Sequence, residues 1–152
     1  TRNKIGKHAN INAQLSDMGF RVLRSKLPFG DYAMLNSLAV CVDTKQGWQE
    51  VASNLCAQHG RFRTECMDAK DNGIQLVILV ESGCAVRDWQ NPRYQKWLKK
   101  PAERRTKNPP ITNERMEKSM ATMAERYGVE WRFTTKARCG AEIVRILTEE
   151  RP

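Results

Sequence analysis

The chain carries Leu27-Pro28-Phe29-Gly30-Asp31-Tyr32 and, a short way on, Val42-Asp43-Thr44-Lys45. The run Leu38–Thr44 is apolar and rich in β-branched residues, which is typical of a strand. The pair Asn36-Ser37 before it is typical of a turn and predicts that Asp31–Leu35 is the first arm of a hairpin. The stretch therefore places its two aspartates on neighbouring arms of one hairpin.

The predicted hairpin also indicates which side chains lie together. Side chains alternate along a strand, so Asp43 and Lys45 should share one face of the sheet. The opposite face should carry Val40, Val42 and Thr44. Gly30 suits a sharp entry into the first arm, which would bring the Asp31 carboxylate beside Asp43.

Two carboxylates and a lysine in this arrangement favour metal-dependent chemistry on phosphates. Mg²⁺ and Mn²⁺ prefer carboxylate oxygens and keep waters that a phosphate can displace. A lysine near a metal ligand can orient or help deprotonate the attacking water and offset charge that develops on the phosphate. We therefore predict a nuclease with Asp31, Asp43 and Lys45 as catalytic residues. The alternative is a solvated strand end, because Asp68-Ala69-Lys70 repeats the spacing in a helical stretch without a hairpin.

Composition limits the class of protein. The chain has 152 residues, 40% of them hydrophobic, which is enough for one globular domain with a core. Its formal net charge of +9 predicts an anionic partner, and DNA is favoured because cations release counterions from phosphates. The five cysteines show no paired short spacing, which predicts reduced thiols rather than disulfides or structural zinc. Without a signal peptide or a long apolar run, we expect the cytoplasm or another reducing, DNA-containing compartment, and neither secretion nor membrane insertion.

Most of the excess charge lies in one segment at about residues 82–111, which we call the basic insertion. Between Arg87 and Lys107 it has eight basic and two acidic residues, a net charge of +6. The basic residues are Arg87, Arg93, Lys96, Lys99, Lys100, Arg104, Arg105 and Lys107. Trp89, Tyr94 and Trp97 are interleaved with them and could stack on unpaired bases. Four prolines predict an irregular loop, and the alternative role is a solubilising loop pinned by its own aromatic rings.

Hydrophobic periodicity predicts the remaining elements. Helices are expected at His8–Met18, from Trp48 onward with a break at Gly60, from Thr112 to Gly128, and at Arg138–Glu149. Further strands are expected at Phe20–Ser25, Gln75–Glu81 and Val129–Thr134. This order predicts an α/β fold, a single domain over residues 1–152 with a central mixed β-sheet flanked by helices on both faces.

Other reactive residue types receive ordinary interpretations. His8 and His59 are too far apart in sequence to indicate a metal pair, so we expect two surface histidines. The stripe Met116, Met120 and Met123 is expected in the core. Cys41 shares a strand face with Asp43, but nothing pairs it with a histidine for nucleophilic chemistry.

Taken in order, four motifs resemble a known family. They are Gly30-Asp31-Tyr32, Asp43-Thr44-Lys45, Gly60-Arg61-Phe62-Arg63-Thr64-Glu65-Cys66 and Leu76-Val77-Ile78-Leu79-Val80-Glu81. Their order and spacing resemble the nuclease domain of the XPF-type structure-specific endonucleases, in the restriction-endonuclease-like PD-(D/E)XK superfamily. The run Met123–Glu130 resembles the helix and strand that close that domain, so the resemblance covers most of the chain.

The resemblance implies a restriction-endonuclease-like fold and an endonuclease dependent on Mg²⁺ or Mn²⁺. Such an enzyme hydrolyses phosphodiester bonds in branched or structured DNA, in repair, recombination or replication. Asp31, Asp43 and the backbone carbonyl of Thr44 would hold the ion, while Arg61 and Arg63 would hold phosphate. The basic insertion would provide the remaining grip on DNA, and the resemblance also implies a homodimer or a partner subunit.

The chain departs from the family pattern at several positions. Thr44 stands where the relatives have arginine, which removes a phosphate contact. Gln49 stands in place of an aspartate, so Glu50 is the nearest candidate for that role, and Glu65 replaces a glutamine and could reach the metal. A non-catalytic nucleic-acid-binding module and a structural or dimerisation subunit therefore stay open as alternatives. The intact Asp31, Asp43 and Lys45 favour the endonuclease.

Overall fold

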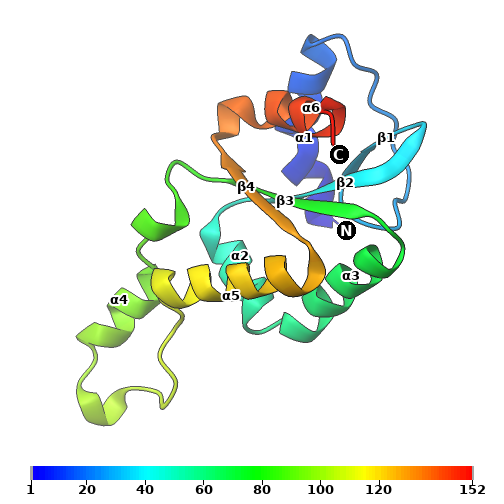
Figure 1. Ribbon diagram of the computed structural model, residues 1–152. Helices are drawn as coiled ribbons and strands as arrows, with labels where there is room; N and C mark the ends of the chain where they lie inside the picture. Colours follow the sequence, from blue (N-terminus) through cyan, green and yellow to red (C-terminus); the bar gives the residue numbers. More distant parts are fainter. Residues whose placement is uncertain (1, 152) are drawn as a thin grey trace.

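A four-stranded mixed sheet lies at the centre of the computed structural model, which describes residues 2–151 apart from the side chains of residues 2–5 and 7 (Figure 1). The strands are β1 (Tyr32–Met34), β2 (Ser37–Lys45), β3 (Gln75–Glu81) and β4 (Glu130–Thr134), in that order across the sheet. β1 is antiparallel to β2, whereas β2, β3 and β4 are parallel. The α/β class and the mixed sheet predicted from the sequence are confirmed.

Helices cover both faces of this sheet (Figure 1). One layer consists of α1 (Arg2–Asp17) and α6 (Cys139–Thr148), which follows the short 3-10 helix η3 (Lys136–Arg138). The other layer consists of α2 (Trp48–Leu55), α3 (His59–Asp71) and α5 (Asn113–Tyr127). Each layer has its own apolar core, because the central strands bury alternate side chains on opposite faces.

The alternation predicted for β2 is confirmed by these two cores. Cys41 packs with the layer of α2, α3 and α5, and Val42 packs with α1 and α6. β3 is buried along both faces, as expected of a central strand. β2 and β3 are parallel, with Asp43 beside Ile78 and Lys45 beside Val80. The carboxyl ends of the two strands therefore lie at the same end of the sheet.

Helix α5 follows its sequence signals closely. The Thr112 hydroxyl accepts a hydrogen bond from the Arg115 amide at 3.3 Å and caps the first turn. The methionine stripe Met116, Met120 and Met123 is buried, as predicted. Gly128 has a φ of 67° and ends the helix in the left-handed conformation.

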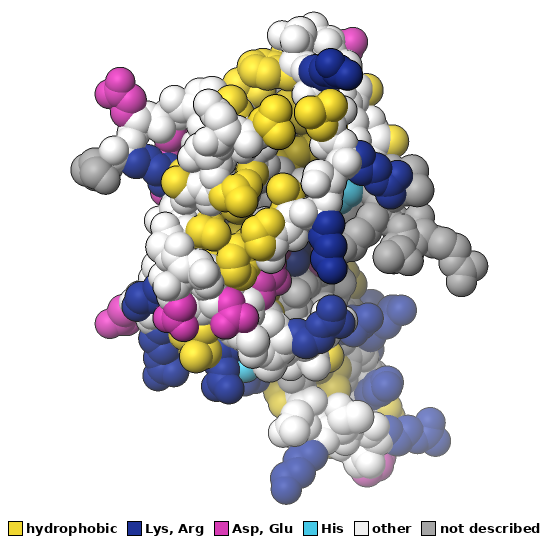
Figure 2. All heavy atoms as spheres, turned by 90° about the vertical axis from the view of Figure 1, so that its right-hand side faces the viewer, with side chains coloured by type: hydrophobic (Ala, Val, Ile, Leu, Met, Phe, Trp, Pro, Cys, Tyr) yellow, Lys and Arg dark blue, Asp and Glu magenta, His cyan; other side chains and the backbone are white. Residues whose placement is uncertain are grey.

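The strand predicted at Phe20–Ser25 is wrong. These residues form a connection without regular secondary structure, and Phe20, Val22 and Leu23 are exposed. Their apolar side chains resemble those of a strand, but within residues 2–151 the segment has no neighbouring strand to pair with. Figure 2 shows hydrophobic side chains gathered on this side of the molecule; the large exposed ones include Met34, Leu35 and Leu38 at the β1–β2 hairpin.

Two predicted helix boundaries also move. The first helix begins at Arg2 rather than at His8. The break in the second helical stretch falls at residues 56–58, and Gly60 lies inside the first turn of α3. Both shifts leave the buried stripe Phe62, Cys66 and Ala69 of α3 as expected.

The basic insertion contains more regular structure than a loop. It holds the 3-10 helices η1 (Val86–Asp88) and η2 (Ala102–Arg104) and the helix α4 (Pro92–Lys99), which extends away from the sheet (Figure 1). The Asn91 side chain is buried, accepts from the Arg93 amide at 3.0 Å and donates to the Ile111 carbonyl at 2.8 Å. The prediction of an irregular loop is wrong because Pro92 occupies the start of α4, where its missing N–H costs nothing.

None of the helices within residues 2–151 is long and apolar enough to cross a membrane. All five cysteines are free thiols, as predicted. Cys41, Cys66 and Cys139 are buried among apolar side chains and serve as small core residues.

Candidate active site

Asp43 and Lys45 form a buried ion pair at the carboxyl end of β2. Lys45 Nζ lies 2.9 Å from Asp43 Oδ2, and Lys45 and Asp43 are 8% and 7% exposed. Lys45 Nζ also lies 5.7 Å from the centre of the Phe62 ring on α3, which adds a cation–π contact. The predicted pairing of these side chains on one face is therefore confirmed, and the alternative of a solvated strand end is excluded.

Burial shapes the electrostatics of this pair. It raises the pKa of Asp43 to about 7, and the negative charges of Asp31 and Glu65 add to the rise, while Lys45 opposes it. Burial alone lowers the pKa of the Lys45 ammonium, but Asp43 and two glutamates nearby raise it by more. The lysine is consequently a cation, and the carboxylate stands in a position where a second cation would be stabilised.

Asp31 reaches the same strand end from the other arm of the hairpin. Its Oδ2 accepts hydrogen bonds from the Thr44 amide at 2.9 Å and the Thr44 hydroxyl at 3.0 Å. Its own amide donates to the Val42 carbonyl at 2.7 Å. Gly30 makes this approach possible, because its φ is 67° and a Cβ there would lie 2.8 Å from the Val42 oxygen.

Helix α1 supports the Asp31 loop in a way that the sequence did not indicate. His8 Nε2 lies 3.8 Å from Asp31 Oδ1, and the His8 ring packs edge-on against Tyr32 with ring centres 5.5 Å apart. The Tyr32 hydroxyl donates to Asn12 Oδ1 at 2.8 Å. The interpretation of His8 as a surface histidine is wrong, since its side chain is only 15% exposed. The one available signal was the spacing of His8 and Asn12, which places both on one face of a helix.

The two glutamates differ in their positions. Glu50 Oε2 accepts from the Gln46 amide at 2.6 Å and so helps to begin α2. Glu65 on α3 is half-buried and acts electrostatically on both Asp43 and Lys45. Within residues 2–151, no three His, Cys, Asp or Glu side chains are arranged as a metal cage of their own. An ion here would draw further ligands from carbonyl oxygens and water, which suits Mg²⁺ and Mn²⁺.

The predicted phosphate-binding arginines lie on α3, the helix whose Phe62 ring contacts Lys45. Arg61 and Arg63 are exposed on either side of Phe62, whose ring contacts Lys45. His59, at the start of the same helix, is exposed as predicted. The buried Phe62 ring packs α3 against Lys45, and the two arginines that flank it in the sequence face solvent.

Three predicted DNA-binding residues of the basic insertion, Tyr94, Trp97 and Arg105, make contacts within the insertion itself. The Trp97 ring stacks on Tyr94 with centres 5.7 Å apart, and its Nε1 donates to the Thr106 carbonyl at 3.2 Å. The Arg105 guanidinium lies over the Trp97 ring, 5.0 Å from its centre, and donates to the Leu98 and Lys100 carbonyls. These contacts are those of a segment pinned by its own aromatic rings.

The other cations of the basic insertion point to solvent. The exposed residues are Arg87, Arg93, Lys96, Lys99, Lys100, Arg104 and Lys107. Near its base, Trp89 and Tyr94 line a hollow of about 420 Å³ together with Arg87 and Gln95. The insertion begins where β3 ends, and Trp48 Nε1 at the start of α2 donates to the Cys84 carbonyl at 2.9 Å. The basic insertion therefore leaves the sheet at the carboxyl ends of the strands, the end that carries Asp43 and Lys45.

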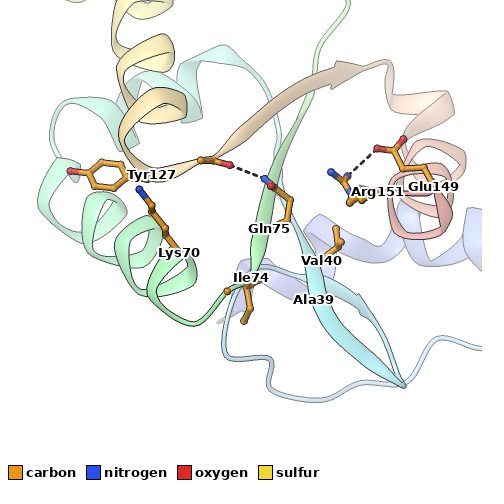
Figure 3. Close-up of a pocket in the computed structure, with 10 residues that line it drawn as sticks. Ala39, Val40, Lys70, Ile74, Gln75, Tyr127, Glu149 and Arg151 are labelled. Atoms are coloured by element: carbon orange, nitrogen blue, oxygen red, sulfur yellow. Dashed lines mark hydrogen bonds and ion pairs between the residues drawn. The ribbon is translucent and has the colours of Figure 1, made fainter.

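A second hollow of about 420 Å³ lies at the opposite end of the sheet (Figure 3). Its polar groups bind one another: Gln75 donates to the Gly128 carbonyl at 2.8 Å, Lys70 to the Arg126 carbonyl at 2.9 Å, and Arg151 pairs with Glu149 at 3.0 Å. This hollow is separate from the strand end that holds the carboxylates.

Comparison with known proteins agrees with this architecture. A family model, the ERCC4 domain, matches residues 2–147. No curated protein sequence matches the chain. The structure of XPF from Aeropyrum pernix superposes with a TM-score of 0.61 at 20% identity, covering 91% of this chain and 58% of that one. XPF from Aeropyrum pernix in complex with DNA superposes with a TM-score of 0.62 at 19% identity, covering 93% and 58%. At this identity the two structures share the fold, and the chain spans 58% of their length.

Proposed function

Because the chain belongs to the ERCC4 domain family, we propose that it is a metal-dependent endonuclease that hydrolyses phosphodiester bonds in branched or otherwise structured DNA. The observation that carries the proposal is the end of β2. There a buried Asp43–Lys45 pair and the Asp31 carboxylate converge, and Asp31 is held against Thr44 by two hydrogen bonds. Burying so many charged groups in one place is costly for stability, and a catalytic role accounts for that cost.

Asp31, Asp43 and the backbone carbonyl of Thr44 are the groups that would hold Mg²⁺ or Mn²⁺, with Glu65 as a further carboxylate nearby. When bound, the ion supplies a Lewis acid and an activated water. The donor set fits, because these ions prefer oxygen ligands and tolerate a site completed by water. The raised pKa of Asp43, about 7, reflects a buried carboxylate that a cation would stabilise. Glu50 supports Lys45 through its charge and begins α2, which favours a supporting role over metal binding.

Lys45 would act as a fixed positive charge. Its raised pKa favours holding the phosphate and orienting the water over accepting a proton. Arg61 and Arg63, exposed on α3 on either side of Phe62 in the sequence, would contact the neighbouring phosphates.

The basic insertion would bind the DNA that extends beyond the cleaved bond. The insertion begins at the end of the sheet where the carboxylates lie, and seven of its cations are exposed. One of the two similar structures is a complex with DNA, which supports this partner. Trp89, which lines the hollow at the base of the insertion, is a better candidate to stack on an unpaired base than Tyr94 and Trp97, because those two rings already stack on each other. A reducing compartment and a homodimer or partner subunit stay predictions.

The test is cleavage of flapped, forked, nicked and linear DNA by the purified protein with Mg²⁺, Mn²⁺ or EDTA. We expect cleavage with either ion and none with EDTA. Asp43→Asn should abolish cleavage while binding stays close to normal. Asp68→Asn is the matched control, since Asp68 belongs to the second Asp-x-Lys and lies exposed on α3. Equal cleavage by Asp43→Asn would mean that the site is elsewhere.

A non-catalytic nucleic-acid-binding module is the second candidate. Thr44 replaces the arginine of the family motif, and Lys45 already neutralises Asp43 by pairing with it. Binding to every substrate without cleavage, with both ions, would establish this alternative. A structural or dimerisation subunit would instead show no affinity for any of these DNAs.

A further inference from the structure

We propose that the hollow at the base of the basic insertion holds one unpaired nucleotide of a DNA branch, with its base stacked on Trp89. This contact selects branched DNA that has a single-stranded arm over nicked or linear duplex. The inference rests on the proposed function and names the part of the substrate that the insertion recognises. It goes beyond charge, because exposed cations alone bind DNA of any structure.

The walls of the hollow are joined by hydrogen bonds before any DNA binds. One wall is η1 with Trp89 after it, and the other is the start of α5. Asn113 Nδ2 donates to the Arg87 carbonyl at 2.6 Å and connects the two walls. The buried Asn91 side chain donates to the Ile111 carbonyl at 2.8 Å and ties the start of α4 to the segment before α5. A preformed site of this kind loses little conformational entropy when a ligand enters.

Trp89 is the aromatic surface of the hollow. Part of its side chain packs against the core of the α2, α3 and α5 layer, and the rest lines the hollow. Each of the other three tryptophans of the chain donates its indole N–H to a backbone carbonyl and contacts a second aromatic ring. Within residues 2–151, Trp89 makes neither contact. Its ring is therefore available to a ligand, and an aromatic ring can stack on any of the four bases.

The polar part of the lining suits the edge of a base. The side chains of Asp88, Gln90 and Gln95 line the hollow and are exposed. A carboxylate accepts hydrogen bonds, and a glutamine amide both donates and accepts them. An unpaired base offers its Watson–Crick edge to such groups, whereas a base within a duplex does not. The volume of about 420 Å³ lies within the range of small-ligand sites, about 300–1,000 Å³, and so suits a single nucleotide.

Cations border the hollow and can hold the phosphates of the same strand. Arg87 lines the hollow, and Arg93 and Lys96 are exposed on α4 on either side of Tyr94 in the sequence. The insertion that carries these residues begins after β3, at the end of the sheet where the carboxylates lie. The arm and the bond to be cut can therefore be bound at the same time.

The test uses forked DNA that carries 2-aminopurine at successive positions of one unpaired arm, because the fluorescence of this base falls when it stacks on an indole ring. The full chain is added in EDTA, so that binding is measured without cleavage. We expect quenching at one position of the arm, since the hollow holds a single base. Trp89→Ala should abolish this quenching.

Affinities of the same variants complete the test. Trp89→Ala should bind the fork about tenfold more weakly, and a nicked duplex of the same length less than about twofold more weakly. Trp89→Phe, which keeps an aromatic ring, should retain most of the affinity for the fork. Phe20→Ala is the matched control, because Phe20 is also a partly exposed aromatic residue, at 41%, but lies outside the insertion. It should bind both DNAs like the wild type.

The outcomes separate this inference from the proposed function. Quenching at every position or at none would overturn the base site, and this wild-type measurement decides the question even if Trp89→Ala fails to fold. Equal losses of affinity for fork and nicked duplex in Trp89→Ala would overturn it as well. Displacement of the fork by an equal concentration of a free deoxynucleoside monophosphate would do the same, because the hollow would then be a mononucleotide site. Quenching at one position without cleavage in Mg²⁺ or Mn²⁺ would support the base site and overturn the endonuclease.

Discussion

The end of β2 and the basic insertion are both charged, yet they are built in opposite ways. At the strand end, Asp43 and Lys45 are almost fully buried and depend on packing between distant parts of the chain. In the insertion, the cations are exposed and the internal bonds join near neighbours, such as Arg105 and the Lys100 carbonyl. Buried charges respond to pH and to bound ions, whereas exposed charges respond to salt. The two regions should therefore be separable by experiment.

The largest effect should be the pH dependence of stability at the strand end. The folded-state pKa of Asp43 is raised from 3.8 to about 7, so the folded protein holds this proton more tightly than the unfolded chain. Its contribution is fully present below about pH 4 and is lost as the pH rises through about 7. Relative to Asp43→Asn, the free energy of unfolding of the metal-free wild type should fall by up to about 4 kcal/mol between pH 4 and pH 8.

Urea unfolding of the two proteins across this range measures the difference. The Asp43→Asn variant keeps the other titrating groups of the wild type, so the difference between the two proteins reports on Asp43 and its pairing with Lys45. A difference that stays flat from pH 4 to pH 8 would show that the carboxylate titrates normally.

Gly30→Ala should give the next largest effect, because it forces Asp31 away from the end of β2. A Cβ would meet the Val42 oxygen at 2.8 Å, and a φ of 67° is itself unfavourable for alanine. We expect a decrease of about 3 kcal/mol in the free energy of unfolding. Gly73→Ala is the control, since Gly73 has a φ of 69° but open space around the added atom. It should cost only about 1 kcal/mol. Equal decreases in the two variants would show that the close approach at Gly30 adds nothing beyond its backbone conformation.

Much of this region was predictable because its signals are local. The alternation along β2 placed Asp43 and Lys45 together, and Gly30 marked the turn that brings Asp31 to them. The bounds of α5 could also be predicted from the sequence, since Thr112 and Gly128 mark its ends. Each of these features depends on residues close together in the sequence, whose period or cap is visible without the fold.

Packing between distant segments could not be read in the same way. His8 meets Asp31 only because α1 packs over the hairpin. The spacing of His8 and Asn12 indicates that they share a helix face, but it does not indicate which element that face contacts. The strand prediction at Phe20–Ser25 was wrong for a related reason. The apolar residues of this segment resemble those of a strand, but a strand must pair with a neighbouring strand, and the sequence does not indicate whether one is present. The start of α4 did carry a signal, Asn91 before Pro92, which the other prolines of the insertion outweighed.

In the basic insertion, removal of exposed charge should weaken DNA binding in a salt-dependent manner. The triple variant Lys96→Ala, Lys99→Ala, Lys100→Ala should reduce affinity for forked DNA by about 2 kcal/mol, and should reduce the salt slope by about 1 for each phosphate that these lysines neutralise. Its stability should not change, because all three side chains are exposed. The matched control removes three other exposed cations, Arg21, Arg24 and Lys26, on the far side of the molecule. Affinity for forked DNA is measured by fluorescence anisotropy. Equal decreases in the two triple variants would show that the lysines of the insertion act only through the net charge of the protein.

The smallest effect should come from a change that keeps charge and removes internal order. Arg105→Lys retains the cation but cannot reproduce two guanidinium hydrogen bonds to the Leu98 and Lys100 carbonyls together with the cation–π interaction on Trp97. Hydrogen exchange in residues 91–107 should become faster by an amount that corresponds to about 1 kcal/mol, with global stability unchanged. Arg104→Lys should have no such effect, because Arg104 is exposed. If both variants exchange like the wild type, the insertion is held by α4 and its Asn91 cap alone. If Arg105→Lys also lowers DNA affinity while Arg104→Lys does not, the insertion binds DNA through a preformed shape as well as through its charge.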